Sequence, residues 1–370
     1  MILETPLWYF YMKSHPEQGT IAQLYGMASD PKWSNISVII SDSSVPGEGE
    51  QKIYDFVREM RQVPGYNPNT SHVIHGLDAD LVMLSLLTHE PNFFVLREDV
   101  FDRASVDLQK PLGLFKVRPL RVKLANTFSD LISKCNMNLE RIINDFIFLM
   151  YFMGNDFVPQ VASIDISDSI DQACTEYISY QMECEPKKRE YFTEPGGRIN
   201  IARVIHFIRR RLLPYENDVM ILRMLKWSRN SSEEKNYVHN RPVADLKEFN
   251  TKVFVDSFIR NAKNSSSESP LKSIFKNLAK REEYFIKEKA FNRPSNVSLP
   301  IHVLNCEEGW HEDYYKVKYR RENASSEEIL ELRKNIALQY LKGVAWVWKY
   351  YNLSDTPSWS WFYPYHFGPL

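Results

Sequence analysis

The tightest restriction on the fold comes from a pattern that occurs twice: a short apolar run, a loop carrying paired acids, and a helix. Residues 36–41 (Ile-Ser-Val-Ile-Ile-Ser) are rich in β-branched side chains, which is typical of a buried strand. A loop with two glycines follows, and from about Glu50 apolar residues recur at helical spacing. This first copy predicts a strand that leads through an acidic loop into a helix.

The second copy of the pattern lies about thirty residues further on. Residues 72–77 are predicted to form a strand, and Asp78 and Asp80 open a helix that leads to a third strand over 93–96. Strands that alternate with helices at this spacing indicate an α/β fold, with a mostly parallel sheet flanked by helices. Active sites of such sheets lie at the carboxyl ends of the strands, where both acidic pairs fall.

The rest of the chain is predicted to be largely helical. Residues 139–153 are apolar nearly all round and indicate a buried helix, and a second helix is predicted over 327–350. We expect three regions: an α/β core that carries the acidic loops over 1–170, a variable helical and linker region over 171–298, and an aromatic-rich helical region over 299–370.

Composition narrows the function classes. Lys and Arg number 46 and Asp and Glu 47, so the net charge of −1 gives no overall attraction for nucleic acid, and a binder would need clustered basic residues. The four cysteines form no CxxC pair, which favours reduced thiols in an intracellular protein. The longest apolar run, 146–153, is too short to span a bilayer, so no membrane association is expected.

Five acids from three separate segments are the candidate catalytic and metal-binding residues: Glu48, Glu50, Asp78, Asp80 and Asp156. Carboxylates that converge repel one another unless a cation neutralises them, and oxygen ligands of this kind suit Mg²⁺ or Mn²⁺. Two such ions can polarise a phosphodiester and activate water. The alternative is that these acids only cap helices or favour the helix dipole in a first turn.

The motifs that surround these acids resemble those of a known family. They are residues 41–53 (SDSSVPGEGEQKI), 76–81 (GLDADL), 88–93 (THEPNF), 154–159 (GNDFVP) and 358–366 (SWSWFYPYH). Together they resemble the conserved blocks of the XRN-type 5′-to-3′ exoribonucleases. Good agreement covers about 36–166 and 309–370, and long ordered motifs of this kind are highly specific.

The resemblance implies processive hydrolysis of single-stranded RNA that carries a 5′ monophosphate, with divalent metal held by the five acids. It implies a PIN-like or flap-nuclease-like core and a largely helical C-terminal region. One tryptophan of the pair Trp359 and Trp361, with Trp361 favoured, would stack on the terminal base, and Lys52 is assigned to substrate binding. Gln51 stands where the family usually has histidine. Trp346 and Trp348 are expected to pack in the core.

One part of the family pattern is missing from the residues that precede the first motif. Residues 1–35 show neither the Asp-x-Asn motif nor the Lys and Arg cluster that the resemblance implies for metal and 5′-phosphate binding. We therefore expect little or no exonuclease activity from this polypeptide alone. A fragment of an active nuclease and a diverged protein that no longer cuts are both consistent with this.

Two other functions stay open at this point. A non-catalytic RNA-binding or scaffold protein would use the arginines between 198 and 211, although a solvated helix face is the simpler interpretation. A flap-type DNA nuclease would share the metal chemistry, but the residues around 88–91 and 359–361 argue against it. A nuclear location is favoured over a cytoplasmic one, a protein activator is left open, and nothing indicates a homo-oligomer.

Overall fold

The computed structural model describes residues 7–9, 37–39, 47–98, 112–162, 166–216, 306–353 and 357–370, with residues 31, 41, 45 and 303. It contains two compact units. The first comprises residues 1–121 and 351–355, and the second comprises residues 122–350 and 356–370. Asp42, residues 163–165 and most of the predicted 171–298 region lie outside the described residues.

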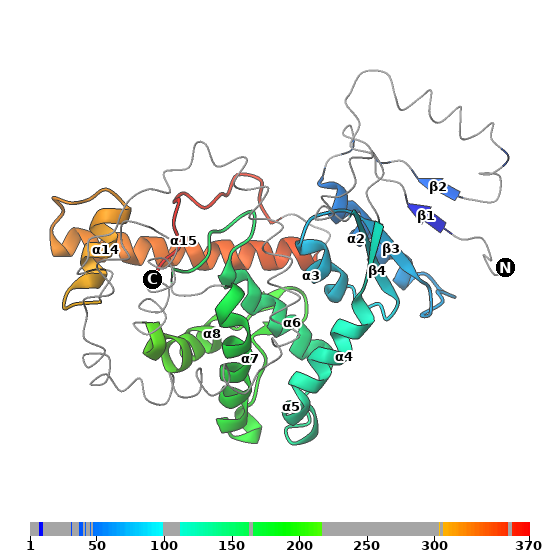
Figure 1. Ribbon diagram of the computed structural model, residues 1–370, viewed down its shortest axis with the longest axis horizontal. Coiled ribbons are helices and arrows are strands. Elements are labelled where there is room, and N and C mark those ends of the chain that lie inside the picture. Colours follow the sequence, from blue (N-terminus) through cyan, green and yellow to red (C-terminus); the bar gives the residue numbers. More distant parts are fainter. Residues whose placement is uncertain are drawn as a thin grey trace, which may run out of the picture. The chain divides into compact units, whose positions relative to one another are not determined.

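The first unit contains the repeated pattern of strand and helix (Figure 1). Its elements are β1 (Leu7–Tyr9), β2 (Ser37–Ile39), α2 (Gly49–Gln62), β3 (His72–His75), α3 (Asp80–Leu87), β4 (Phe93–Glu98) and β5 (Leu112–Lys116), followed by the start of α4 (Val117–Thr127). Each strand and helix predicted between residues 36 and 96 is present, with its bounds shifted by a few residues.

A three-stranded sheet in the order β3-β4-β5 organises this unit. β3 and β4 are parallel and are joined through α3, with His72 opposite Phe93. β5 runs antiparallel to β4, with Lys116 opposite Phe94, and a separate pair is formed by β1 and β2 in parallel. The fold is therefore mixed α/β, as expected, but the described sheet is small and contains an antiparallel edge.

Packing of α2 on the sheet and on α3 fixes the start of both helices. Tyr54 of α2 is fully buried, and its ring stacks on Phe93 of β4 with centroids 5.7 Å apart. The Tyr54 hydroxyl donates a hydrogen bond to the carbonyl of Leu81 in α3, at 2.9 Å. Because a buried hydroxyl without a partner is costly, this bond specifies how α2 lies against α3. The two acidic helix starts are thereby held in one unit.

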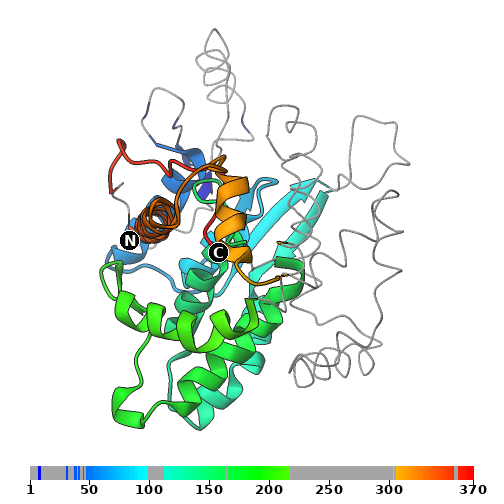
Figure 2. The ribbon, with the colours of Figure 1, turned by 90° about the vertical axis from the view of Figure 1, so that its left-hand side faces the viewer.

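The second unit is built mainly from helices (Figure 1). Its elements are the rest of α4, then α5 (Ser129–Ser133), α6 (Leu139–Met150), η2 (Tyr151–Met153), α7 (Ile166–Glu183), η3 (Pro186–Lys188), β6 (Thr193–Glu194), β7 (Arg198–Ile199), α8 (Ile201–Phe207), the π-helix η4 (Ile208–Leu212), η5 (Leu213–Tyr215), α14 (Trp310–Lys318) and most of α15 (Ser326–Asn352). Figure 2 looks nearly along the axis of α15, with α14 beside it.

Aromatic side chains join α6 to α15 inside this unit. Asn138 caps α6 by accepting hydrogen bonds from the amides of Glu140 and Arg141. Phe148 of α6 meets the buried Trp348 of α15 edge to face, with centroids 6.0 Å apart. The predicted helices over 139–153 and 327–350 are thus confirmed, and Trp348 packs in the core as expected. Among the described residues no helix is long and apolar enough to cross a membrane.

Candidate active site

Four of the five predicted acids lie at the N-termini of two neighbouring helices in the first unit. Glu48 and Glu50 flank the start of α2, and Asp78 and Asp80 flank the start of α3. The pKa of Glu50 shows that the other three acids act on it. Burial raises this pKa to about 9, and the charges of Asp80, Glu48 and Asp78 add to the effect of burial. Like charges act in this way only when they are close. The charges of these four acids therefore act on one another, and their shared role as metal ligands stays a prediction.

The acids do not act as helix caps. Glu48 occupies the N-cap position of α2 and Ala79 that of α3, and neither makes a side-chain capping hydrogen bond. Asp80 instead accepts a hydrogen bond from the hydroxyl of Tyr351, at 3.1 Å, and is hydrogen-bonded to Glu50. The capping interpretation therefore lacks the contacts that it requires, whereas the first-turn positions of Glu50 and Asp80 agree with the helix-dipole interpretation.

The chemistry of this cluster fits a hard, hydrated cation. Within the described parts of the chain, no three acids, histidines or cysteines are close enough to form a ready ligand shell. Mg²⁺ usually keeps several of its waters and contacts one or two carboxylates directly, so it does not require a complete shell of protein ligands. A divalent ion would also relieve the repulsion that raises the pKa of Glu50.

Gln51 and Lys52 follow directly on α2. The Gln51 side chain is only 5% exposed, and neither its amide oxygen nor its amide nitrogen has a hydrogen-bond partner among the described residues. The Lys52 ammonium donates to the carbonyl of Val45 and so ties the preceding loop to the helix. The structure therefore gives Lys52 a loop-holding contact, and its assignment to substrate binding stays a prediction.

Asp156, the fifth acid, belongs to the second unit. It is exposed on a short loop, residues 154–161, here called the acid loop. Asn155 accepts hydrogen bonds from the amides of Phe157 and Val158, and Gly154 has a φ of +94°. A Cβ on Gly154 would lie 2.9 Å from the amide nitrogen of Gln160, so only glycine fits. Participation of Asp156 in the same metal site stays a prediction.

The two candidate stacking residues lie on residues 357–367, here called the aromatic loop. Trp359 is 74% exposed, whereas Trp361 is half-buried beside Trp346, with ring centroids 5.9 Å apart. Phe362, which the sequence analysis missed, is 73% exposed. An exposed aromatic face is what a nucleobase stacks on, so Trp359 offers the more open platform of the two tryptophans.

Comparison with known proteins decides the family. Residues 136–370 match the profile described as the Xrn1 helical domain, and residues 18–99 match that of the XRN 5'-3' exonuclease N-terminus. The first match alone spans more than half of the chain. The chain belongs to the XRN family.

Curated relatives agree with this assignment. The chain is similar to the 5'-3' exoribonuclease 2 of Debaryomyces hansenii (29% identity over 94% of this chain and 43% of that protein). It is similar to the proteins of that name from Yarrowia lipolytica (30%, over 94% and 40%) and Arabidopsis thaliana (29%, over 92% and 40%). The chain thus spans about two fifths of the length of these curated relatives.

The arginines of this XRN-family chain that favoured a separate RNA-binding role are largely engaged within the fold. Arg203 donates to the side-chain oxygen of Gln181 at 2.9 Å, and Arg210 lies 3.5 Å from Glu183. Arg211 pairs with Glu183 and also with Glu176. Side chains held by carboxylates are less available to phosphates. Most of the arginines between 198 and 211 are therefore explained by pairing within the fold and not by RNA binding.

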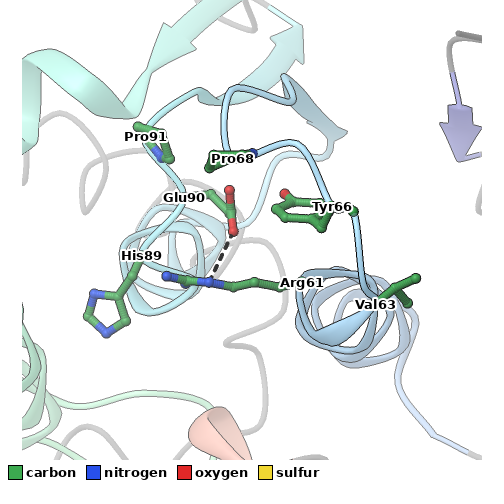
Figure 3. A pocket seen from close by; sticks show the side chains of 8 residues that line it. Arg61, Val63, Tyr66, Pro68, His89, Glu90 and Pro91 are labelled. Atoms are coloured by element: carbon green, nitrogen blue, oxygen red, sulfur yellow. Dashed lines mark ion pairs between the residues drawn. The ribbon is translucent and has the colours of Figure 1, made fainter. Parts of the chain in front are cut away.

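A shallow pocket lies at the opposite, amino-terminal end of β3 and β4, away from the acids (Figure 3). Glu90, almost fully buried, points into it and pairs with Arg61 at 3.6 Å and with His72 at 3.7 Å. The Tyr66 hydroxyl hydrogen-bonds to the ring of His72 at 2.8 Å. The polar groups of this XRN-family pocket satisfy one another, which explains the buried Glu90 without a ligand.

Tyr351 is a site residue that the sequence analysis missed. Its hydroxyl donates to Asp80, and its carbonyl accepts from the guanidinium of Arg58 on α2. Both contacts span more than 250 positions in the sequence. Periodicity and motif spacing relate residues that are close in the sequence. They therefore cannot reveal that Tyr351 of this XRN-family protein contacts residues near the other end of the chain.

Proposed function

We propose that this chain contributes to a 5′-to-3′ exoribonuclease that hydrolyses phosphodiester bonds of RNA with a 5′ monophosphate. The observation that carries the proposal is the convergence of Glu48, Asp78 and Asp80 on Glu50 at the ends of strand-helix connections. Membership of the XRN family and relatives named 5'-3' exoribonuclease 2 support it.

The proposed cofactor is Mg²⁺ or Mn²⁺. Glu48, Glu50, Asp78 and Asp80 would hold it, and Asp156 is proposed as the fifth acid. Bound ions of this kind polarise the phosphodiester, supply activated water and stabilise the leaving oxygen. The chain's own part is to gather the acids: α2 and α3 bring them together, and the hydroxyl of Tyr351 orients Asp80.

The proposed substrate contacts come from the aromatic loop. Trp359 and Trp361 would stack on the bases at the 5′ end, and stacking accepts every base, as a processive nuclease requires. The exposure of Trp359 supports this role. Lys52 is proposed as a phosphate contact, and the low activity expected of this polypeptide alone stays a prediction.

The finer architecture and the cellular setting are also proposals. A PIN-like, mostly parallel sheet is supported by the β3-α3-β4 crossover, with β5 as an antiparallel edge. The regions 1–170, 171–298 and 299–370 remain the proposed domains. An intracellular, preferably nuclear, location and a protein activator rest on sequence considerations alone.

The test uses single-turnover digestion of 3′-labelled RNA with the protein in excess, because low activity is expected. Slow digestion that needs Mg²⁺ or Mn²⁺ and a 5′ monophosphate should occur, and Asp78→Asn with Asp80→Asn should reduce it at least about 100-fold. The control is Asp130→Asn, at an exposed pair with Lys134. Digestion that persists in the double variant would overturn the proposal.

The same assay separates the alternatives. RNA binding without any digestion at high protein concentration would favour a non-catalytic RNA-binding protein of the same family. Equal digestion of a DNA strand of the same sequence would favour a flap-type DNA nuclease. The engagement of the arginines between 198 and 211 in ion pairs and hydrogen bonds argues against the first of these.

A further inference from the structure

Three residues on one face of α15 each contact both the acid loop and the aromatic loop. They are Tyr340, Gly343 and Trp346, spaced three positions apart on successive turns, and they are called the α15 stripe below. All three, and both loops, belong to the second unit. The two loops themselves lie about two hundred residues apart in the sequence, so the stripe is a shared support for distant segments.

Tyr340 forms the first of the three double contacts. Its hydroxyl donates a hydrogen bond to the carbonyl of Pro159 in the acid loop, at 2.9 Å. Its ring meets Tyr363 of the aromatic loop edge to face, with centroids 5.7 Å apart. Tyr340 is almost completely buried, so loss of either partner would leave an unfilled position.

Gly343 forms the second contact by having no side chain. A Cβ at this position would lie 2.5 Å from Cγ1 of Val158 and 2.7 Å from Cη2 of Trp361. Both distances are far below van der Waals contact. The helix therefore has a notch in which one side chain from each loop is seated, and only glycine permits this.

Trp346 forms the third contact and the most extensive one. Its ring lies 5.0 Å from that of Phe157 in the acid loop and 5.9 Å from that of Trp361 in the aromatic loop. Its indole nitrogen donates a hydrogen bond to the carbonyl of Ser358, at 2.8 Å. One side chain thus fixes the residue after Asp156 and the start of the aromatic loop together.

In each of the two loops, residues that pack on the stripe stand close to a residue that is exposed. Phe157 and Val158 are turned to the stripe, while the adjacent Asp156 is exposed. In the aromatic loop Trp361 is seated and Trp359 is exposed. Asp156 and Trp359, the two residues proposed to act on metal and RNA, are thus exposed next to residues that the stripe anchors.

We propose that the α15 stripe positions Asp156 and the aromatic loop as one body, with Trp346 as the principal positioning residue. A displacement of either loop is then transmitted to the other through the helix. The functional consequence rests on the proposed function: stacking of an RNA base on the aromatic loop and metal coordination by Asp156 are coupled, and each ligand favours the arrangement that the other needs.

The mechanical part is tested by hydrogen exchange of the full chain without any ligand. Trp346→Leu removes the ring contacts and the bond to Ser358, so amides of residues 155–161 and 357–363 should both exchange about tenfold faster. The matched control is Trp348→Phe, two positions along the same helix, which packs on Phe148 and Tyr151 instead. Faster exchange in only one loop, or the same pattern in the control, would overturn the proposal.

A second variant distinguishes the loss of one anchoring contact from general unfolding of the chain. Trp346→Phe keeps an aromatic ring but cannot donate to Ser358. It should accelerate exchange mainly in the aromatic loop, with the thermal midpoint close to that of the unmodified chain. An unchanged aromatic loop in this variant would mean that the bond to Ser358 does not anchor the loop, and the role given to Trp346 would be wrong.

The functional part is tested with Mn²⁺ and a short 5′-phosphorylated RNA. In the unmodified chain Mn²⁺ should slow exchange in residues 357–363 and should tighten RNA binding, and both effects should vanish in Trp346→Leu. If Mn²⁺ and RNA bind independently while the two loops still loosen together in the variant, the mechanical coupling stands and its functional consequence is wrong. Absence of any metal or RNA binding would count against the proposed function alone.

Discussion

Asp145 illustrates how much a single buried carboxylate contributes to the second unit. It is fully buried in α6 and accepts four hydrogen bonds: from the hydroxyl of Tyr177, the amide of Phe192, and the amide and hydroxyl of Thr193. These bonds join α6, α7 and β6. The sequence placed Asp145 inside an apolar helix, and nothing in the spacing indicated its partners.

Replacing Asp145 with alanine should destabilise the second unit by roughly 3 to 5 kcal/mol, because four buried donors would lose their acceptor. Urea unfolding followed by tryptophan fluorescence measures this. Asp130→Ala, which breaks an exposed pair with Lys134, is the control and should change the stability by less than about 0.5 kcal/mol. Equal effects of the two substitutions would contradict the structural role of Asp145.

The same residue predicts a pH dependence. Burial raises the pKa of Asp145 to about 6 from its ordinary value of 3.8, although its hydrogen bonds oppose the rise. The folded state therefore binds this proton more tightly than the unfolded state. The stabilisation is complete below pH 4 and is lost as the pH rises to about 6, by at most about 3 kcal/mol.

Asp145→Asn cannot titrate at this position and isolates that contribution. The unfolding free energy of the unmodified chain, compared with that of the variant between pH 4 and 7, should fall by up to the stated amount. Parallel pH profiles of the two proteins would show that Asp145 has the same pKa in the folded and unfolded states.

At the scale of elements, α15 shows where sequence reasoning succeeds and where it stops. Its helical periodicity predicted residues 327–350, and the structure gives Ser326–Asn352. Trp346 and Trp348 were both assigned to core packing, but only Trp348 is buried there. Which face of a helix meets which loop depends on segments about two hundred residues away, and local periodicity does not encode that.

Gly343→Ala tests the notch in α15, because a tightly filled notch and an empty one predict opposite changes in the free energy of unfolding. Alanine has the higher helix propensity, which alone would stabilise the helix by about 1 kcal/mol. The clash with Val158 and Trp361 should outweigh this gain and lower the stability by roughly 1 to 3 kcal/mol in urea unfolding. Lys342→Ala, at the exposed neighbouring position, should be nearly neutral. A stabilised Gly343→Ala protein would show that the notch is not tightly filled.

In the sheet, too, some elements could be predicted from the sequence and one could not. β3, α3 and β4 follow from β-branched runs and helical spacing, since each is specified by neighbouring residues. The antiparallel addition of β5, with Leu112 to Lys116 along β4, was not foreseen. Strand direction is set by tertiary pairing, and the sequence between the two strands gave no turn signal that would fix it.

At the scale of the whole molecule, the described site residues of the first unit come from the two ends of the chain. The sequence placed Glu48, Glu50, Asp78 and Asp80 at a common end of the sheet, and the influence of the other three charges on the pKa of Glu50 agrees with that placement. The contribution of Tyr351 was missed, since it comes from the far end of the chain. The role of Asp156 stays a prediction.

Metal binding should stabilise the folded protein. Mn²⁺ at about 100 times its dissociation constant adds roughly 2.7 kcal/mol, which corresponds to an increase of several degrees in the unfolding temperature. The increase should disappear on removal of the metal with EDTA and should be absent in Asp78→Asn with Asp80→Asn. A similar increase in that double variant would locate the bound ion elsewhere.

The hydrogen bond from Tyr340 to Pro159 joins residues 181 positions apart. At about 5 to 20 residues per second, a ribosome needs roughly ten to forty seconds to synthesise the chain between them. Throughout that interval Phe157 and Val158 have been made, but the surface that covers them has not. Nascent chains of this protein should therefore depend on chaperones that shield apolar side chains until α15 emerges, and slower translation of the intervening region should increase that dependence.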